Sequence, residues 1–135
     1  MTGVQTCALP ISLGSAFHEA EVWLSMLPET VVLARAELCL ARVWFRLNQL
    51  DRVSAGAWAD ATERALAAVA DPARMRRLRG SVAAARAYIA TLGPDAAPER
   101  ARRLAEQALA DVPPGGVAFV VACLGLGAAA LAMAA

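Results

Sequence analysis

The chain of 135 residues contains no lysine, one histidine and few aromatic residues, and each shortage excludes a class of site. A Walker A loop needs a lysine on the phosphates, so this nucleotide site is absent. His18 is the only histidine, which excludes sites with several histidine ligands, and Ser15 and Glu19 give it no triad spacing. We therefore expect no enzyme, no metal site and no cofactor, and His18 is expected on a helix surface.

Cysteine is also scarce, and the net charge is close to zero. Cys7, Cys39 and Cys123 are too far apart for a metal or redox motif, and an odd count does not suggest a disulfide scaffold. A reducing cytoplasm is the expected compartment, with Cys39 and Cys123 as inert core thiols. The net charge of +1 gives no general attraction to nucleic acid or to an anionic membrane.

Alanine fills 34 positions, and it favours helices that pack closely. Strand-forming residues are sparse, so the composition predicts an all-α fold. Proline, glycine and Asn-Gln-Leu-Asp breakers separate stretches with helical periodicity. The predicted helices span 15–27, 33–48, 51–69, 72–92, 97–112 and 117–135. Nine large side chains at buried positions of these helices are expected in the core: Trp23, Leu24, Trp44, Leu47, Trp58, Leu66, Tyr88, Leu104 and Leu109.

An internal repeat connects three of these helices. Leu24, Leu66 and Leu109 occupy matching places and lie 42 and 43 residues apart. A constant period with two helices per unit is typical of an α-solenoid of antiparallel helix pairs. The Ala-Leu-x3-Pro ending of the fifth helix matches the second helix of a tetratricopeptide repeat (TPR), although the period exceeds the standard length of about 34. The sequence therefore predicts a TPR-like solenoid.

One basic cluster and one uncharged segment are candidates for binding. Arg74, Arg76, Arg77 and Arg79 form the basic cluster, and residues 71–106 hold eight arginines and four acidic residues. The cluster indicates either a contact with phosphate or an acidic partner, or a solvated helix face with arginine stems over alanines. No aromatic residue lies among these arginines, which disfavours stacking on single-stranded nucleic acid. Residues 117–135 carry no charge and suit either a helix buried between neighbours or a membrane span.

The sequence of residues 19–66 resembles that of the helical-repeat domain of MalT-type transcriptional regulators of the LuxR family. The matching positions are Ala20, Trp23-Leu24, Leu27-Pro28-Glu29, Ala34-Arg35, Leu38-Cys39-Leu40 and Trp44. The resemblance implies a sensor domain between an N-terminal nucleotide-binding switch and a C-terminal helix-turn-helix. Its partner would be a protein or small-molecule effector, and DNA and ATP would be bound only by domains absent from this chain. It transfers no ligand-binding residue.

Residues 1–11 resemble the in-frame translation of a common sequencing adapter. We therefore expect residues 1–12 to form no domain. Residues 13–135 are then a partial TPR-like helical-repeat domain truncated at both ends, and 117–135 is its cut last helix. The expected function is the sensor and protein-interaction segment of a bacterial cytoplasmic regulator. The alternatives are a free-standing TPR-like adaptor and a scaffold anchored in a membrane through 117–135.

Overall fold

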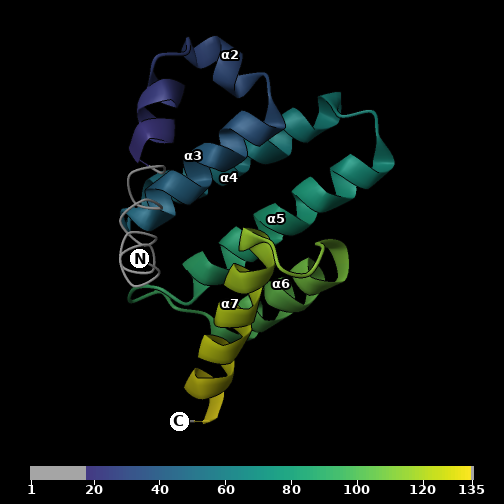
Figure 1. Ribbon diagram of the computed structural model, residues 1–135. Helices are drawn as coiled ribbons and strands as arrows, with labels where there is room; N and C mark the ends of the chain where they lie inside the picture. The colour runs from purple at the N-terminus through teal and green to yellow at the C-terminus, as the bar shows by residue number, and fades with distance from the viewer. Residues whose placement is uncertain (1–17, 135) are drawn as a thin grey trace, which may run out of the picture.

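The computed structural model describes residues 18–134, with α2 at the top of Figure 1 and the end of α7 at the bottom. No strand occurs between residues 18 and 134, which confirms the all-α class. The expectation for residues 1–12 lies outside the described residues. A helical segment over residues 18–25 is followed by α2 (Glu29–Leu33), α3 (Ala36–Asn48), α4 (Arg52–Ala65), the 3-10 turn η1 (Leu66–Ala68), α5 (Pro72–Ala90), α6 (Pro98–Asp111) and α7 (Val117–Ala134).

The short helix α2 is absent from the sequence prediction, which has a breaker at Pro28. Here the Pro28 carbonyl accepts hydrogen bonds from the N–H groups of Val31 and Val32, at 3.0 and 3.2 Å. Proline suits a helix start, where its missing N–H would have no partner, so Pro28 begins a new helix. Arg35 then adopts an extended conformation and separates α2 from α3.

The start of α5 matches the prediction. Asp71 caps the helix by accepting a hydrogen bond from the Ala73 N–H at 3.1 Å, and Pro72 occupies the first helical position. Gly93 follows the helix with φ of +78°, in the left-handed region that glycine adopts readily. The four arginines of the cluster therefore lie within one continuous helix, Pro72–Ala90.

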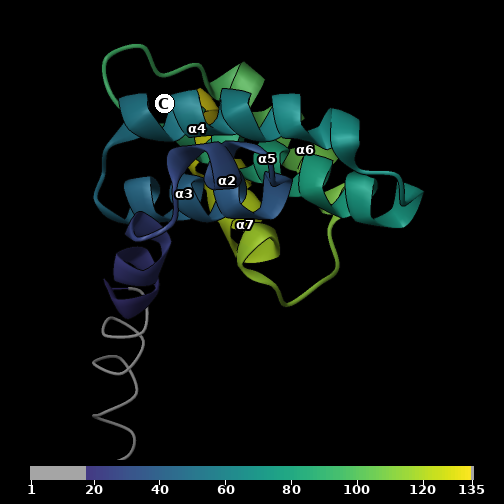
Figure 2. The same ribbon diagram turned by 90° about the horizontal axis from the view of Figure 1, so that it is seen from above.

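Helix α5 is the centre of the fold because it packs against α3, α4, α6 and α7. The pairs α3–α4 and α5–α6 are each joined by a short connection and have extensive contacts. Seen from above, α4 and α7 lie on opposite sides of α5 (Figure 2). The two sides of α5 therefore face different neighbours.

Two different cores flank this central helix. Between α3, α4 and α5 the buried cluster contains four alanines together with large side chains, among them Leu40, Val43, Leu47, Leu66, Leu78 and Val82. Between α5, α6 and α7 the buried cluster consists of alanines, at positions 83, 84, 108 and 122. Gly80 lets α5 approach the end of α6, because a Cβ there would lie 2.8 Å from Asp111 Cβ and from Val112 Cγ1.

Eight of the nine side chains predicted in the core are buried or half-buried. Trp23 is the exception and the prediction for it is wrong, since 64% of its surface is exposed. Adjacent helical residues point about 100° apart, and in this segment Leu24 faces the core. Trp23 instead lines an open apolar pocket with Leu27 and Phe45.

Candidate functional site

The four arginines predicted as a single patch lie on the first half of α5, and all four are exposed. Residues three or four apart share a helix face, whereas residues two apart do not. Arg74 and Arg77 therefore point to one side of α5, and Arg76 and Arg79 point to another. The structure divides the predicted patch into two parts with different surroundings.

Arg74 is already occupied. Its Nε donates to Glu37 Oε1 on α3, and the two side chains form an ion pair. This hydrogen bond is the main reason that the pKa of Glu37 lies below its ordinary value. Both side chains are about half exposed, so the pair joins α3 to α5 without offering a free charge to a ligand.

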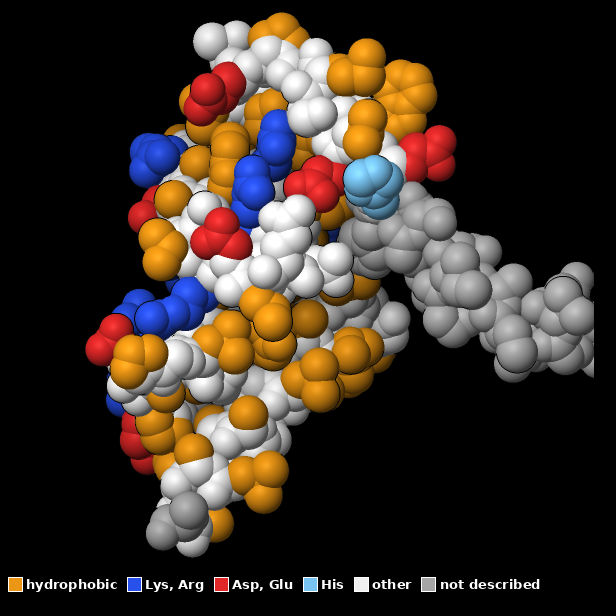
Figure 3. All heavy atoms as spheres, turned by 90° about the vertical axis from the view of Figure 1, so that its left-hand side faces the viewer, with side chains coloured by type: hydrophobic (Ala, Val, Ile, Leu, Met, Phe, Trp, Pro, Cys, Tyr) orange, Lys and Arg blue, Asp and Glu red, His pale blue; other side chains and the backbone are white. Residues whose placement is uncertain are grey.

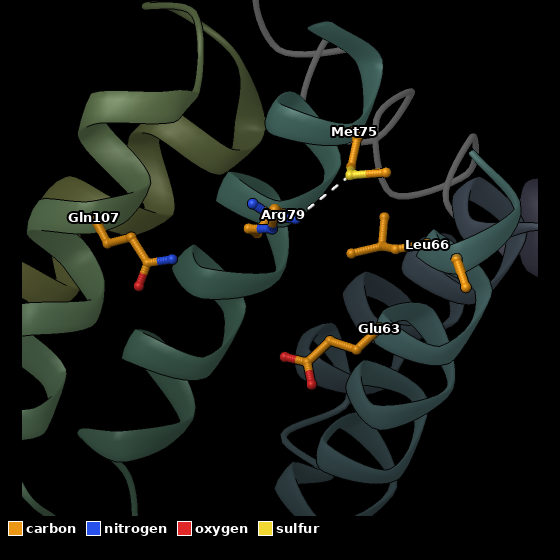
Figure 4. Close-up of a pocket in the computed structure, with 6 residues that line it drawn as sticks. Glu63, Leu66, Met75, Arg79 and Gln107 are labelled. Carbon is orange, nitrogen blue, oxygen red and sulfur yellow. Dashed lines mark hydrogen bonds between the residues drawn. The ribbon is translucent and has the colours of Figure 1, made fainter. Parts of the chain in front are cut away.

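Arg79 lies at an open pocket of about 460 Å³ between α4, α5 and α6 (Figure 4). Its Nη2 is 3.4 Å from Met75 Sδ, and Glu63 of α4 and Gln107 of α6 also line the pocket. Glu63 is not free, because its Oε1 accepts from Arg86 Nε at 3.0 Å. The pocket is thus polar on two sides, and its one acidic group is already neutralised.

Arg86 of α5 binds two carboxylates of α4. Its Nη2 donates to Asp60 Oδ1 at 2.6 Å, beside the bond to Glu63. Burial alone would lower the pKa of Arg86, but the hydrogen bonds to Glu63 and Asp60 outweigh it and raise that pKa. Asp60 and Glu63 are exposed, and their ion pairs with Arg86 connect α4 to α5.

Arg77 lies on the other side of α5, at a pocket that we call the Arg77 pocket. This pocket of about 270 Å³ lies between α3, α5 and α7, and its lining includes Trp44, Arg77, Ser81, Val112, Pro113 and Phe119. Trp44 and Phe119 are half-buried, and Ser81 lies one turn after Arg77 on α5. Arg77 makes no hydrogen bond or ion pair with any residue of the described range.

Sequence reasoning found Arg77 but missed the residues that surround it. The spacing of Ser81, four residues after Arg77, was visible in the sequence and could have indicated a shared face. Trp44 lies on α3, 33 residues before Arg77, and Phe119 lies on α7, 42 residues after it, so no local pattern joins them to α5. Only the packing of α3 and α7 on the same side of α5 brings these aromatic rings together.

The remaining candidate residues have structural surroundings. His18 is exposed, as predicted. Cys39 is fully buried, its Sγ donates to the Val32 carbonyl at 3.1 Å, and burial raises the pKa of its thiol, which fits an inert thiol. Cys123 is exposed on α7, so its expected burial is wrong. Residues 18–134 contain no cluster of three or more side chains suited to hold a metal ion.

Helix α7 is long and apolar enough to cross a membrane by length and composition. Within residues 18–134, α7 is covered on one face only, where Ala122, Gly125 and Ala129 are buried. Five large side chains of α7 are exposed, namely Val117, Val120, Leu124, Leu131 and Met133. Hydrophobic side chains accordingly gather over the lower part of the molecule in Figure 3, at the height of α7 in Figure 1.

Comparison with known proteins leaves the identification to the sequence and the geometry. No family model, curated protein or solved structure matches the chain.

Proposed function

We propose that the chain is the sensor and protein-interaction segment of a TPR-like helical-repeat domain in a bacterial LuxR-family regulator of the MalT type. It would receive an effector or partner and transmit that binding to a nucleotide-binding domain and a helix-turn-helix elsewhere in the protein. The segment itself would bind and would catalyse nothing.

The packing order of the helices is the observation that supports this proposal best. Helix α5 contacts the helices next to it in the chain and also α3 and α7, two elements before and after it. Contacts between each helix and the next but one are what a stack of two-helix units requires. The helices α4 and α6 contain 14 residues each, and the repeated leucines, Leu66 and Leu109, lie at or near their ends.

The stack also provides a surface for binding. Alternate helices of such an array line one face, and here α3, α5 and α7 together line the Arg77 pocket. An apolar pocket with a few polar groups is the usual form of a binding site. The sequence pattern of residues 19–66, which resembles that of MalT-type regulators, supports the assignment to that family.

The decisive experiment is to sequence the genomic DNA on both sides of this reading frame, from reads that contain no adapter sequence. We expect a Walker A motif upstream and a helix-turn-helix downstream in the same frame. Stop codons that bound the repeats would instead establish a free-standing adaptor. In a second assay, ATP turnover by the purified chain should equal that of a control without protein, and turnover above the control would overturn the non-enzymatic role.

A membrane-anchored scaffold is the second candidate, because α7 is uncharged and five of its large side chains are exposed. The test is flotation of the chain with phosphatidylcholine vesicles. Our proposal expects the protein to stay in the unbound fraction. Flotation that is lost when Leu124 and Leu131 are both replaced by serine would favour the anchor instead.

A further inference from the structure

The Arg77 pocket combines a free positive charge with an apolar hollow. Arg77 is exposed, and its guanidinium has no acceptor in the part of the chain that the structure describes. Its neighbour Arg74 is neutralised by Glu37. Asp111 packs beside Gly80 at the end of α6, and it makes no ion pair with Arg77. Within residues 18–134 the Arg77 guanidinium therefore has no protein acceptor and is open to solvent or to a ligand.

The rest of the lining is suited to an apolar group. The rings of Trp44 and Phe119 and the side chains of Val112 and Pro113 line the hollow, and Ser81 is the polar side chain next to Arg77 along α5. Pockets that enclose whole small-molecule ligands usually measure about 300–1,000 Å³. A pocket of about 270 Å³ is small for such a ligand, and it suits a single inserted side chain.

We infer that the Arg77 pocket binds an acidic peptide segment in which one large apolar side chain is flanked by aspartate or glutamate. The apolar side chain enters the hollow between Trp44 and Phe119. A flanking carboxylate accepts charge-assisted hydrogen bonds from the Arg77 guanidinium, which is planar and suited to bidentate pairing. The Ser81 hydroxyl supplies a further donor. The inference rests on the proposed interaction role, and it adds the chemistry of the partner.

Charge complementarity carries the choice of an acidic occupant. Arg77 lines the pocket without a carboxylate partner in residues 18–134, whereas Arg74 is paired with Glu37. A second copy of this chain is a poor occupant, because its most exposed apolar helix, α7, carries no carboxylate. A peptide with acidic residues around one apolar side chain satisfies both the cation and the hollow.

The test uses the full chain and a fluorescein-labelled peptide with one phenylalanine between two aspartates, measured by fluorescence anisotropy. We expect a dissociation constant on the order of tens of micromolar, as for a small and mostly open site. Replacing the aspartates of the peptide by asparagine, or its phenylalanine by alanine, should each weaken binding about tenfold, since each removes one of the two contacts.

Arg77→Gln should also weaken binding about tenfold, because it removes the charged donor. Arg103→Gln is the matched control, since Arg103 is exposed on α6, lacks an ion pair in the described range and loses the same charge. Circular dichroism on both variants checks that their helix content is unchanged. Equal losses in the two variants would mean diffuse attraction to positive charge and would overturn the inference. Binding of a labelled oligothymidine through Arg77 in place of the peptide would overturn it as well.

The outcomes also separate the inference from the proposed function. No binding of the peptide at about 1 mM would overturn the inference. A Walker A motif and a helix-turn-helix in the same reading frame would leave the regulator assignment standing in that case. Binding through Arg77 without those flanking motifs would refute the regulator assignment and support the pocket.

Discussion

The two sides of α5 are packed in different ways. Toward α3 and α4 the helix buries Leu78 and Val82 among other large side chains. Toward α6 and α7 it buries alanines, and Gly80 and Gly125 lie where helices approach closely. At Gly125 an added Cβ would lie 3.4 Å from Ala87 Cβ, which is an ordinary contact. One helix thus belongs to a core of large side chains and to a core of small ones.

This difference shows that a similar helix–helix arrangement can be stabilised by different means. Large side chains stabilise the fold mostly through removal of their apolar surface from water, which contributes about 25 cal/mol per Å². Alanine buries little surface, so helices joined by alanines depend on close contact between backbones. The first core should therefore be sensitive to lost volume, and the second to added volume.

The largest expected effect is the loss of volume in the first core. Leu78→Ala should lower the free energy of unfolding by about 2–5 kcal/mol, because Leu78 is buried and its removal leaves a cavity. Leu109→Ala is the matched change in the second core, and it should cost less because Leu109 is only half-buried. Chemical denaturation of both variants measures the difference. Equal costs would contradict the contrast between the cores.

Added volume should destabilise the second core, and the change in the free energy of unfolding should be smaller than that of Leu78→Ala. Gly80→Ala introduces a Cβ 2.8 Å from Asp111 Cβ and Val112 Cγ1, and such overpacking costs about 1–3 kcal/mol. The gain in helix propensity, about 1 kcal/mol, offsets only part of this cost. Gly56→Ala in α4 meets no atom within 4 Å, so it should stabilise the protein by up to about 1 kcal/mol. Thermal unfolding should thus shift in opposite directions, and stabilisation by Gly80→Ala would disprove the close approach.

The outer face of α7 should affect association more than stability. Leu124→Ser removes an exposed side chain, 58% accessible, from a row of exposed hydrophobic residues. Such patches promote association, so light scattering should show a lower apparent mass for the variant. The unfolding free energy should change by less than about 0.5 kcal/mol. Val53→Ser is the control, because Val53 is exposed singly on α4 and should leave the mass unchanged.

The smallest effect should be a dependence on pH at the contact of α3 with α5. The pKa of Glu37 is lowered in the folded chain by its hydrogen bond with Arg74. A carboxyl with a lowered pKa stabilises the fold above its unfolded value, here 4.5, and this contribution is lost as the pH falls through the folded pKa. Glu37→Gln should therefore reduce the loss of thermal stability on acidification. An unchanged acid profile would show that the pair contributes nothing.

Much of the fold could be predicted from local signals, and the errors have physical causes. Asp71-Pro72 marked the start of α5 because capping depends on adjacent residues, whereas the helix ends at Ala90 with Thr91 as its cap, short of the predicted end at 92. The exposure of Trp23 and Cys123 could not be predicted, since helical periodicity does not show which neighbour covers a face. For the same reason, the sequence identified the four arginines but did not predict that they divide between two sides of α5.

The most direct test of the two-core account is native-state hydrogen exchange, resolved along the chain. Both cores share α5, so its buried segment from Leu78 to Ala87 should exchange most slowly, through unfolding of the whole helical domain. Amides of α7 should exchange faster, because that helix buries one narrow face of small residues. Protection in α7 equal to that of α5, or separate opening of the two halves of α5, would contradict the account.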